Sequence, residues 1–399
     1  MAWNWQLKDW PNFVWNSQRF LRAETAFLLS AGRLQGVAQR LGLIKYDEML
    51  AQVMSEEAVS TSRIEGEAVL PDAVLKSIRL RLGLEQGDDD SGPAERGVSE
   101  MAVAVRKDFA APLTDATLWH WHESLLGAKQ ETLERRFRIE DIGRYRTHPE
   151  PMQVVSNRAD KPRVYFEAPP SVRVPSEMAH FLAWYNGESA SEPAVTRAAL
   201  AHLYFVSIHP FEDGNGRIGR AVAEKALLQA LGQDTLLCLS PAIFARRSDY
   251  YRALQETQTS NDVDDWIAWF AGIVIEALHR TEAQVVFTLD KAEMLERLKG
   301  QLNRRQEKAL LRMFAEGPKG FDGGMSADNY NSITHAPHST VTRDLNDLVD
   351  KGAMWRTGER RHTRYYLSAT LRPTPRVTVD ERGQIVIAAP TPESNQIER

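Results

Sequence analysis

The sequence predicts a mainly α-helical fold with a small amount of β-structure. Apolar residues recur at helical spacing along most of the 399 residues. Residues that favour strands gather around a turn near 152–166 and again near 352–367, and each of these runs predicts a hairpin. Hydrophobic residues make up 43 % and charged residues 26 % of the chain, which is the composition of a globular protein. The length indicates two or three domains.

Composition excludes several classes of protein. The net charge of -5 argues against a general polyanion binder, so any nucleic-acid contact must come from a local basic patch. Cys238 is the single cysteine, which excludes an internal disulfide framework and a cysteine-rich zinc site. The N-terminus lacks an apolar signal core, and the longest apolar run, 266–278, is too short to span a bilayer. We therefore expect a cytoplasmic protein.

The N-terminal part of the chain is expected to be helical in two regions. Residues 1–45 form a Trp-rich helical region, whose apolar stripe comprises Leu21, Phe27, Leu28, Leu34, Val37 and Leu41. Its aromatic opening can cap the core or form a groove that stacks a base, and the cap is the simpler interpretation. Residues 46–84 hold a second helix, and Gly66 is well placed to end it.

An acidic loop follows, and residues 98–285 are then expected to form one helical domain. Helices are predicted over 98–127, with a break near Pro112 and Thr114 as an N-cap, and over 175–187 and 192–208. The hairpin near 152–166 turns at Asn157–Asp160. It is either a decoration or a clamp that pairs with an extended segment of a protein substrate. Further helices are predicted over 221–231 and 261–278.

The stretch from Ser207 to Arg220 carries the chemistry. It reads Ser-Ile-His-Pro-Phe-Glu-Asp-Gly-Asn-Gly-Arg-Ile-Gly-Arg. Gly214, Asn215 and Gly216 tolerate left-handed backbone, and consecutive amide groups in such a turn form a nest for anions. The helix that follows adds the positive end of its dipole.

The charged residues of this stretch complete the pattern. Arg217 and Arg220 are three apart, so they share a helical face, and their forked side chains suit phosphate oxygens. Asp213 can hold Mg²⁺ against those phosphates. His209 has an ordinary pKa near ~6.5, which suits a general base at neutral pH. Together these residues indicate nucleotide phosphoryl or nucleotidyl transfer.

The same stretch resembles the motif of the Fic family. His-Pro-Phe-Glu-Asp-Gly-Asn-Gly-Arg-Ile-Gly-Arg agrees with it at every defined position, and the resemblance covers about residues 50–280. The resemblance implies a helical Fic-type domain that binds ATP. The α-phosphate would lie over residues 214–216, and Arg217 and Arg220 would bind the β- and γ-phosphates. Asp213 would hold Mg²⁺. His209 would take the proton from a Ser, Thr or Tyr hydroxyl of a target protein, and AMP would be transferred to that hydroxyl.

A second resemblance concerns Thr61-Ser62-Arg63-Ile64-Glu65-Gly66. Thr61 and Glu65 are four apart and share a helical face. These residues resemble the Fic family's inhibitory motif, which implies that Glu65 pairs with Arg220 and blocks productive binding of the γ-phosphate. Glu65 can also serve as the base for water in a reverse reaction that removes AMP. The residues alone leave open an exposed carboxylate near a helix cap.

Further expectations rest on the same resemblance. The hairpin near 152–166 would be the flap that orients the target side chain, and the downstream region would enclose the adenine. Tyr251 and Asn261 are our candidates there, although a core aromatic and a helix cap explain them equally well. The partners implied are target proteins with an acceptor hydroxyl, the chain itself included. A homodimer is expected as well.

Residues 300–368 are predicted to form a winged helix-turn-helix domain, followed by a flexible tail over 371–399 with a short hairpin around Gly383. Helical patterns at 305–314, 326–333 and 339–351 precede the second hairpin. Base contacts would come from Ser339, Thr340, Thr342 and Arg343, and phosphate contacts from Arg356, Arg360, Arg361 and Arg364. DNA is one partner that this domain can take, and protein is the other. A DNA-binding transcriptional regulator with a nucleotide-sensing site is therefore the alternative function.

Overall fold

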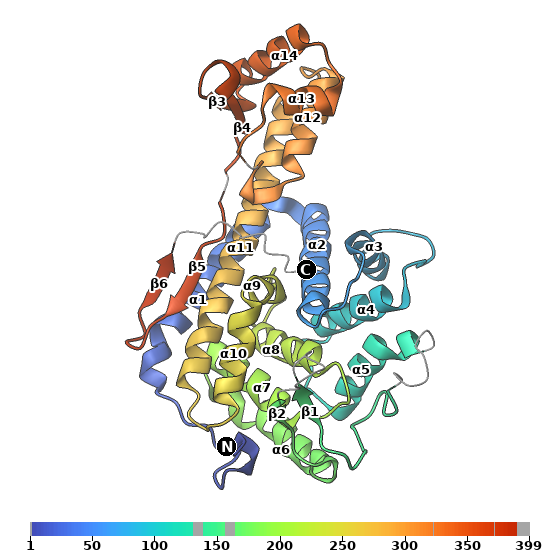
Figure 1. Ribbon diagram of the computed structural model, residues 1–399, viewed down its shortest axis with the longest axis vertical. Helices are drawn as coiled ribbons and strands as arrows, with labels where there is room; N and C mark the ends of the chain where they lie inside the picture. Colours follow the sequence, from blue (N-terminus) through green and yellow to red (C-terminus); the bar gives the residue numbers. More distant parts are fainter. Residues whose placement is uncertain (1, 131–138, 156–163, 322, 371, 389–399) are drawn as a thin grey trace. The chain divides into compact units, whose positions relative to one another are not determined.

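The computed structural model describes residues 2–130, 139–155, 164–321, 323–370 and 372–388 (Figure 1). The chain forms two compact units. The first comprises residues up to Gln35, Leu43–Leu278 and Arg376–Ala388, and the second comprises Gly36–Gly42 and His279–Pro375. The turn predicted at Asn157–Asp160 and the last eleven residues of the predicted tail, 389–399, lie outside the described residues.

Helices make up most of both units, which confirms the mainly α-helical fold class. The helices found in or entering the first unit are α1 (Ser17–Ala38), α2 (Gly42–Ile64), α3 (Pro71–Arg81), α4 (Pro93–Lys107), α5 (Asp115–Gln130), α6 (Val174–Asn186), α7 (Ala194–Ile208), α8 (Asn215–Leu231), α9 (Ser240–Ala245), α10 (Arg247–Thr257) and α11 (Asp264–Arg297). The boundary between the two units falls within α11.

The centre of the first unit is the pair α7 and α8, which pack against each other. Every residue of α7 from Val195 to Ile208 is buried, because the helix is apolar around almost its whole circumference. A buried carboxylate caps its start: Glu24 of α1 accepts hydrogen bonds from the backbone amides of Val195 at 2.9 Å and Thr196 at 2.8 Å. The negative charge also suits the positive end of the helix dipole. The turn between α7 and α8 is thus held between two buried helices.

Two predicted helix starts can be compared with the structure. Thr114 does cap α5, since its hydroxyl accepts a hydrogen bond from the amide of Thr117 at 3.2 Å. The predicted start of α8 at Ala221 was wrong, because the helix begins at Asn215. Gly214 adopts the left-handed conformation (φ 80°) immediately before it, so the chain turns into the helix within the glycine-rich stretch.

The first hairpin consists of β1 (Gln153–Val155) and β2 (Val164–Glu167), paired antiparallel. The N-terminal aromatic residues pack against it: Trp5, Phe166 and Ala168 form a buried cluster. The indole of Trp5 donates to the carbonyl of Glu167 at 2.7 Å. The Trp-rich opening is therefore a cap that covers the hairpin.

A second hairpin in this unit lies in the predicted tail. β5 (Arg376–Val379) and β6 (Ile385–Ala388) pair antiparallel around Gly383, as expected. Val377 is fully buried, and its carbonyl accepts a hydrogen bond from Arg246 at 2.9 Å. Residues 376–388 are therefore part of the packed first unit, and the prediction of a flexible tail was wrong for them.

The second unit contains three helices followed by a hairpin, in the order that the sequence predicts. These elements are α12 (Arg304–Phe314), α13 (Ala327–Thr334), α14 (His338–Asp350), β3 (Met354–Thr357) and β4 (Arg364–Leu367). Their apolar faces share one buried core that includes Leu310, Leu345 and Leu367. An isolated bridge between Met325 and Tyr365 adds a third short segment beside β4.

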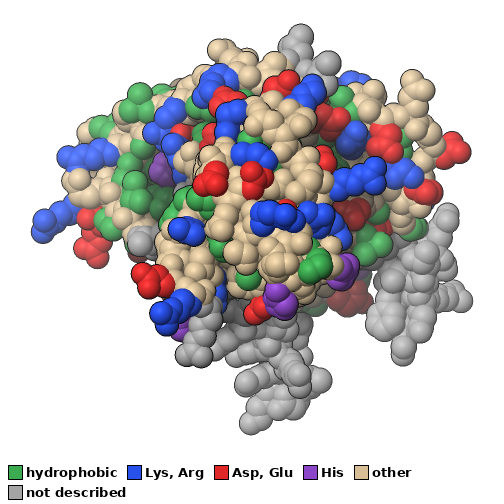
Figure 2. All heavy atoms as spheres, turned by 90° about the horizontal axis from the view of Figure 1, so that it is seen from above, with side chains coloured by type: hydrophobic (Ala, Val, Ile, Leu, Met, Phe, Trp, Pro, Cys, Tyr) green, Lys and Arg blue, Asp and Glu red, His purple; other side chains and the backbone are tan. Residues whose placement is uncertain are grey.

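Two further observations concern the helices and the charged side chains. No helix among the described residues is long and apolar enough to cross a membrane. On the face drawn in Figure 2, lysine and arginine side chains are interspersed with acidic ones. This mixture agrees with the small net charge of -5.

Candidate active site

The turn between α7 and α8 holds His209 in an unusual backbone conformation. Its φ of 52° lies in the left-handed region, which residues other than glycine seldom adopt. Arg146 fixes the main chain there: its Nε donates to the carbonyl of His209 at 2.8 Å, and its amide donates to the carbonyl of Pro210 at 2.9 Å. Arg146 also donates to the carbonyl of Pro169, just beyond β2, at 2.6 Å. The histidine is thereby tied to the end of the first hairpin.

The imidazole of His209 is oriented for proton transfer. Nδ1 lies 3.2 Å from the carbonyl oxygen of Val206, and a carbonyl can only accept, so Nδ1 carries the proton. Nε2 then keeps its lone pair. Burial lowers the pKa of His209 to about 4, and the cation of Arg146 acts in the same direction. The ring is therefore neutral, and can accept a proton, at any pH above about 5.

The loop before α8 is closed by Asn215. Its side chain accepts from the amide of Phe211 at 3.0 Å and donates to the carbonyl of Phe211 at 2.8 Å. Asp213 accepts from the amide of Gly214 at 2.6 Å. A Cβ atom at Gly216 would lie 2.2 Å from Oε1 of Glu65, so a side chain there would require the Glu65 carboxylate to shift. Residues 214–216 thus stand at the N-terminus of α8, where backbone amides favour an anion.

Arg220 is almost completely buried, with 1 % of its side chain exposed, and it binds the end of α2. Its Nη2 lies 2.8 Å from Oε1 of Glu65 and donates to the carbonyl of Thr61 at 3.0 Å. Its Nε donates to the hydroxyl of Thr61 at 2.8 Å. Burial opposes the charge of Arg220, but the Glu65 carboxylate outweighs it and the pKa of Arg220 is raised. The predicted pair Thr61 and Glu65 therefore meets one arginine.

Arg217 is buried to a similar degree, with 2 % of its side chain exposed, and it lies between two carboxylates. Nη1 donates to Glu67 at 2.7 Å, and Nη2 donates to Asp213 at 3.3 Å. Three carboxylates therefore surround the two arginines of the motif. Two of them, on Glu65 and Glu67, come from the residues that follow α2.

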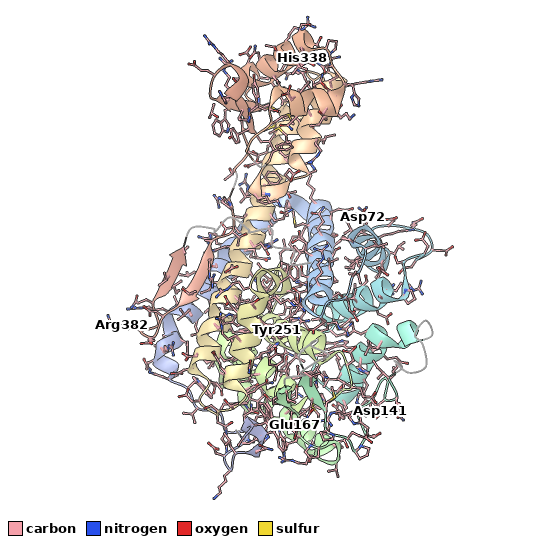
Figure 3. All side chains as sticks on the ribbon, viewed as in Figure 1. Asp72, Asp141, Glu167, Tyr251, His338 and Arg382 are labelled. Atoms are coloured by element: carbon pink, nitrogen blue, oxygen red, sulfur yellow. The ribbon has the colours of Figure 1, made fainter. Side chains whose placement is uncertain are left out.

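The two candidates for an adenine site lie in different surroundings. The hydroxyl of Tyr251, labelled in Figure 3, donates to the carbonyl of Ile64 at 2.9 Å and lies 3.5 Å from Glu65. Asn261 is buried, and its carbonyl accepts from the amide of Val14 at 2.7 Å. Among the described residues no hydrogen bond joins Asn261 to 61–67 or 209–220. Nor does Asn261 cap α11, which begins at Asp264.

Sequence reasoning missed three residues of this site: Glu67, Arg146 and His122. The ring of His122 is buried and stacks on Phe211, with 4.2 Å between the ring centroids. Its Nδ1 accepts from the amide of Gly143 at 3.0 Å, and burial lowers the pKa of His122 to about 4. In the sequence, the one available signal was for Glu67, an acidic residue two positions after Glu65.

A divalent metal would have to be held by few protein ligands. The described residues contain no group of three or more His, Cys, Asp or Glu side chains that could bind one. Asp213 remains suitable, since 54 % of its side chain is exposed and it lies beside the nest. Mg²⁺ is often held by one or two carboxylates together with substrate phosphates. The residues present therefore fit Mg²⁺ that arrives with a nucleotide.

Comparison with known proteins identifies two segments. Residues 3–84 match a domain of unknown function (DUF4172), and residues 112–227 match the Fic/DOC family. A probable protein adenylyltransferase of Aquifex aeolicus is 32 % identical over 93 residues, which is 23 % of this chain and 27 % of the relative. The protein adenylyltransferase Fic of Drosophila ananassae is 41 % identical over 81 residues, 20 % of this chain and 15 % of the relative. The match thus spans about a quarter or less of either relative.

Solved structures give weaker likenesses. A Fic family protein from Desulfovibrio desulfuricans has a TM-score of 0.47 at 20 % identity, covering 86 % of this chain and 95 % of its own. A Fic domain containing signaling protein from Bacteroides thetaiotaomicron has a TM-score of 0.47 at 19 % identity. The match covers 64 % of this chain and 95 % of that protein's chain. The family model includes the whole stretch from His209 to Arg220. The chain thus contains a segment, residues 112–227, that matches the Fic/DOC family.

Proposed function

We propose that the protein transfers AMP from ATP to a Ser, Thr or Tyr hydroxyl of a target protein, and that Glu65 holds this activity off. The observation that carries the proposal is the ion pair of Glu65 with the buried Arg220, 2.8 Å long, within a complete motif. A group that binds an arginine in this way competes with a phosphate for the same donors. The names of the relatives, protein adenylyltransferases, point to the same reaction.

The chemistry needs a base, an anion site and two cations. Nε2 of His209 accepts the proton of the target hydroxyl, and that oxygen attacks the α-phosphorus. The bond from the α-phosphorus to the bridging oxygen breaks, and pyrophosphate leaves. The amides at the start of α8 stabilise the charge on the α-phosphate, while Arg217 and Arg220 bind the β- and γ-phosphates. Asp213 would hold Mg²⁺, which neutralises phosphate charge when it is bound.

The first hairpin supplies a way to position the target. Its short strands present main-chain groups that an extended peptide can pair with. Phe166 of β2 lies near the base, with 6.3 Å between its ring centroid and that of His209. A hydroxyl of a segment paired with β2 would thus approach Nε2. The same site also supports the reverse reaction, in which Glu65 activates water to remove AMP.

The test is intact mass spectrometry after incubation with ATP and Mg²⁺. The proteins are the wild type, Glu65→Gly, His209→Ala and the double variant, each alone and with a bacterial lysate. We expect an AMP-sized gain that increases at least tenfold in Glu65→Gly, because Arg220 becomes available to the γ-phosphate. It should disappear when His209 is replaced. No gain with any variant would refute AMP transfer. If the wild type removes AMP from a modified target and the variants do not, the result would instead favour the reverse reaction, hydrolytic removal of AMP.

A second candidate function is DNA binding by the second unit. The start of α14 carries exposed His338, Ser339, Thr342 and Arg343, and its first acidic residue, Asp344, is buried against Arg305. Arg356 and Arg364 extend this basic character onto the hairpin, where Trp355, 48 % exposed, stacks on Tyr366 with 4.7 Å between centroids. Donors at the start of a helix and arginines beside it favour a major-groove contact flanked by phosphates.

A further inference from the structure

Glu67 occupies a defined position beside the motif. The turn after α2 is held by two backbone hydrogen bonds, from the amide of Gly66 to the carbonyl of Arg63 at 3.1 Å and from the amide of Glu67 to the carbonyl of Ser62 at 3.0 Å. Gly66 adopts the left-handed conformation that this turn requires, with φ 80°. The turn brings the Glu67 carboxylate to within 2.7 Å of Nη1 of Arg217. About 20 % of the Glu67 side chain is exposed.

The contact occupies the donors that a phosphate would need. Nη1 of Arg217 binds Glu67 and Nη2 binds Asp213, so both terminal nitrogens face carboxylates. A phosphate that takes both terminal nitrogens as a bidentate pair competes with both carboxylates for them, and only Nε, which is buried, has no partner among the described residues. Because Arg217 is almost completely buried, losing an anionic partner without a replacement is costly. The Glu67 carboxylate and a bidentate phosphate therefore exclude each other at the terminal nitrogens of Arg217.

We infer that Glu67 is a specificity-determining residue that closes the β-phosphate subsite, just as Glu65 closes the γ-phosphate subsite. This rests on the proposed function for the assignment of Arg217 to the β-phosphate. With both subsites closed, the site favours a nucleoside monophosphate over a di- or triphosphate. Removing Glu65 alone opens one subsite and leaves the other closed. Full affinity for ATP then requires that the turn carrying both glutamates moves away.

The test is calorimetric titration of AMP, ADP and ATP with Mg²⁺ into wild type, Glu65→Gly, Glu67→Gln and the double variant. Glu67→Gln keeps the size of the side chain and removes its charge. We expect it to increase the affinity for ADP about tenfold and to leave that for AMP within twofold. The double variant should bind ATP more tightly than Glu65→Gly does. The control is Asp72→Asn, an equal charge change at an exposed residue of α3, labelled in Figure 3.

An unchanged ratio of ADP to AMP affinity in Glu67→Gln would overturn the inference, and so would an equal gain for AMP. If Glu67→Gln unfolds, as its melting temperature would reveal, Glu67→Asp replaces it. The shorter side chain keeps the charge but draws it back from Arg217, and the same change in the ratio is expected. Titration needs no catalysis, so absence of AMP transfer with a changed ratio refutes only the proposed function. AMP transfer with an unchanged ratio refutes only the role of Glu67.

Discussion

Arg146 is a buried cation whose side chain binds main-chain oxygens. It donates to the carbonyls of His209 and Pro169, and 1 % of the residue is exposed. Burial lowers the pKa of Arg146 to about 10, so it stays charged at neutral pH. One residue thus holds the left-handed backbone of His209 and keeps a positive charge beside its ring. A cation near an imidazole disfavours protonation of the ring.

Replacing Arg146 should therefore change both the rate and the pH dependence of AMP transfer. In a Glu65→Gly background, we expect Arg146→Met to lower kcat at least tenfold and to leave the KM for ATP within twofold. Loss of the cation raises the pKa of His209. Because the ring is protonated, and so inactive as a base, below that pKa, the acidic limb of the pH–rate profile moves to higher pH. Arg146→Lys keeps the charge, so it should lower kcat without moving the limb. If the acidic limb lies at the same pH in Arg146→Met and Arg146→Lys, the charge of Arg146 does not lower the pKa of His209.

At the scale of residues, the sequence predicts what lies within one turn or one helix. The pattern from His209 to Arg220 predicts an anion site because its residues are neighbours in the chain. Glu65 and Arg220 are far apart in the sequence, and the pairing that the family resemblance implied is present in the structure. Arg146 and His122 have no such signal, since each acts through contacts with distant main chain or a distant ring. Spacing along a helix does not reveal those partners.

At the scale of elements, helical periodicity located most helices but not all their ends. The start of α8 was misplaced because glycine and asparagine favour turns, and here Asn215 bonds back to Phe211 while already helical. The three helices and the hairpin of the second unit were predictable because each has a continuous apolar face. The partner that α14 and the hairpin bind was not predictable, because exposed residues take no part in folding the core.

DNA binding by α14 and the hairpin β3–β4 makes a separate prediction. A labelled 30-base-pair duplex of mixed sequence should bind the full chain at 50 mM salt and weaken steeply towards 200 mM. Arg356→Ala removes a phosphate contact, so the slope of log affinity against log salt should fall by about 1. Fluorescence anisotropy measures both. Arg312→Ala is the control, because that guanidinium already pairs with Glu316. Absence of binding at 50 mM salt would refute this candidate function.

At the scale of the whole molecule, three histidines link stability to pH: His122 and His202 are buried, and His209 is half-buried. Burial lowers the pKa of His122 and of His209 to about 4 and that of His202 to about 3. Arg220 adds to the effect on His202, whose Nε2 lies 3.1 Å from the hydroxyl of Tyr250. Between pH 4 and ~6.5 the unfolded chain binds protons at these sites that the folded chain does not. The stabilisation is therefore complete above about pH 6.5 and is lost as the pH falls towards 4.

The effect of one histidine is measurable as a difference between proteins. Each pKa unit corresponds to ~1.4 kcal/mol, so His202 should contribute on the order of 2–4 kcal/mol between pH 7 and pH 4. His202→Gln removes this proton site, and its melting temperature should fall less steeply with decreasing pH than that of the wild type. Tryptophan fluorescence follows the first unit, because every tryptophan except Trp355 belongs to it. His180→Gln, an exposed position on α6, should keep the wild-type slope. Equal slopes in wild type and His202→Gln would mean that His202 is not kept neutral by the fold, since a histidine that titrates normally in the folded protein contributes no pH dependence in this interval.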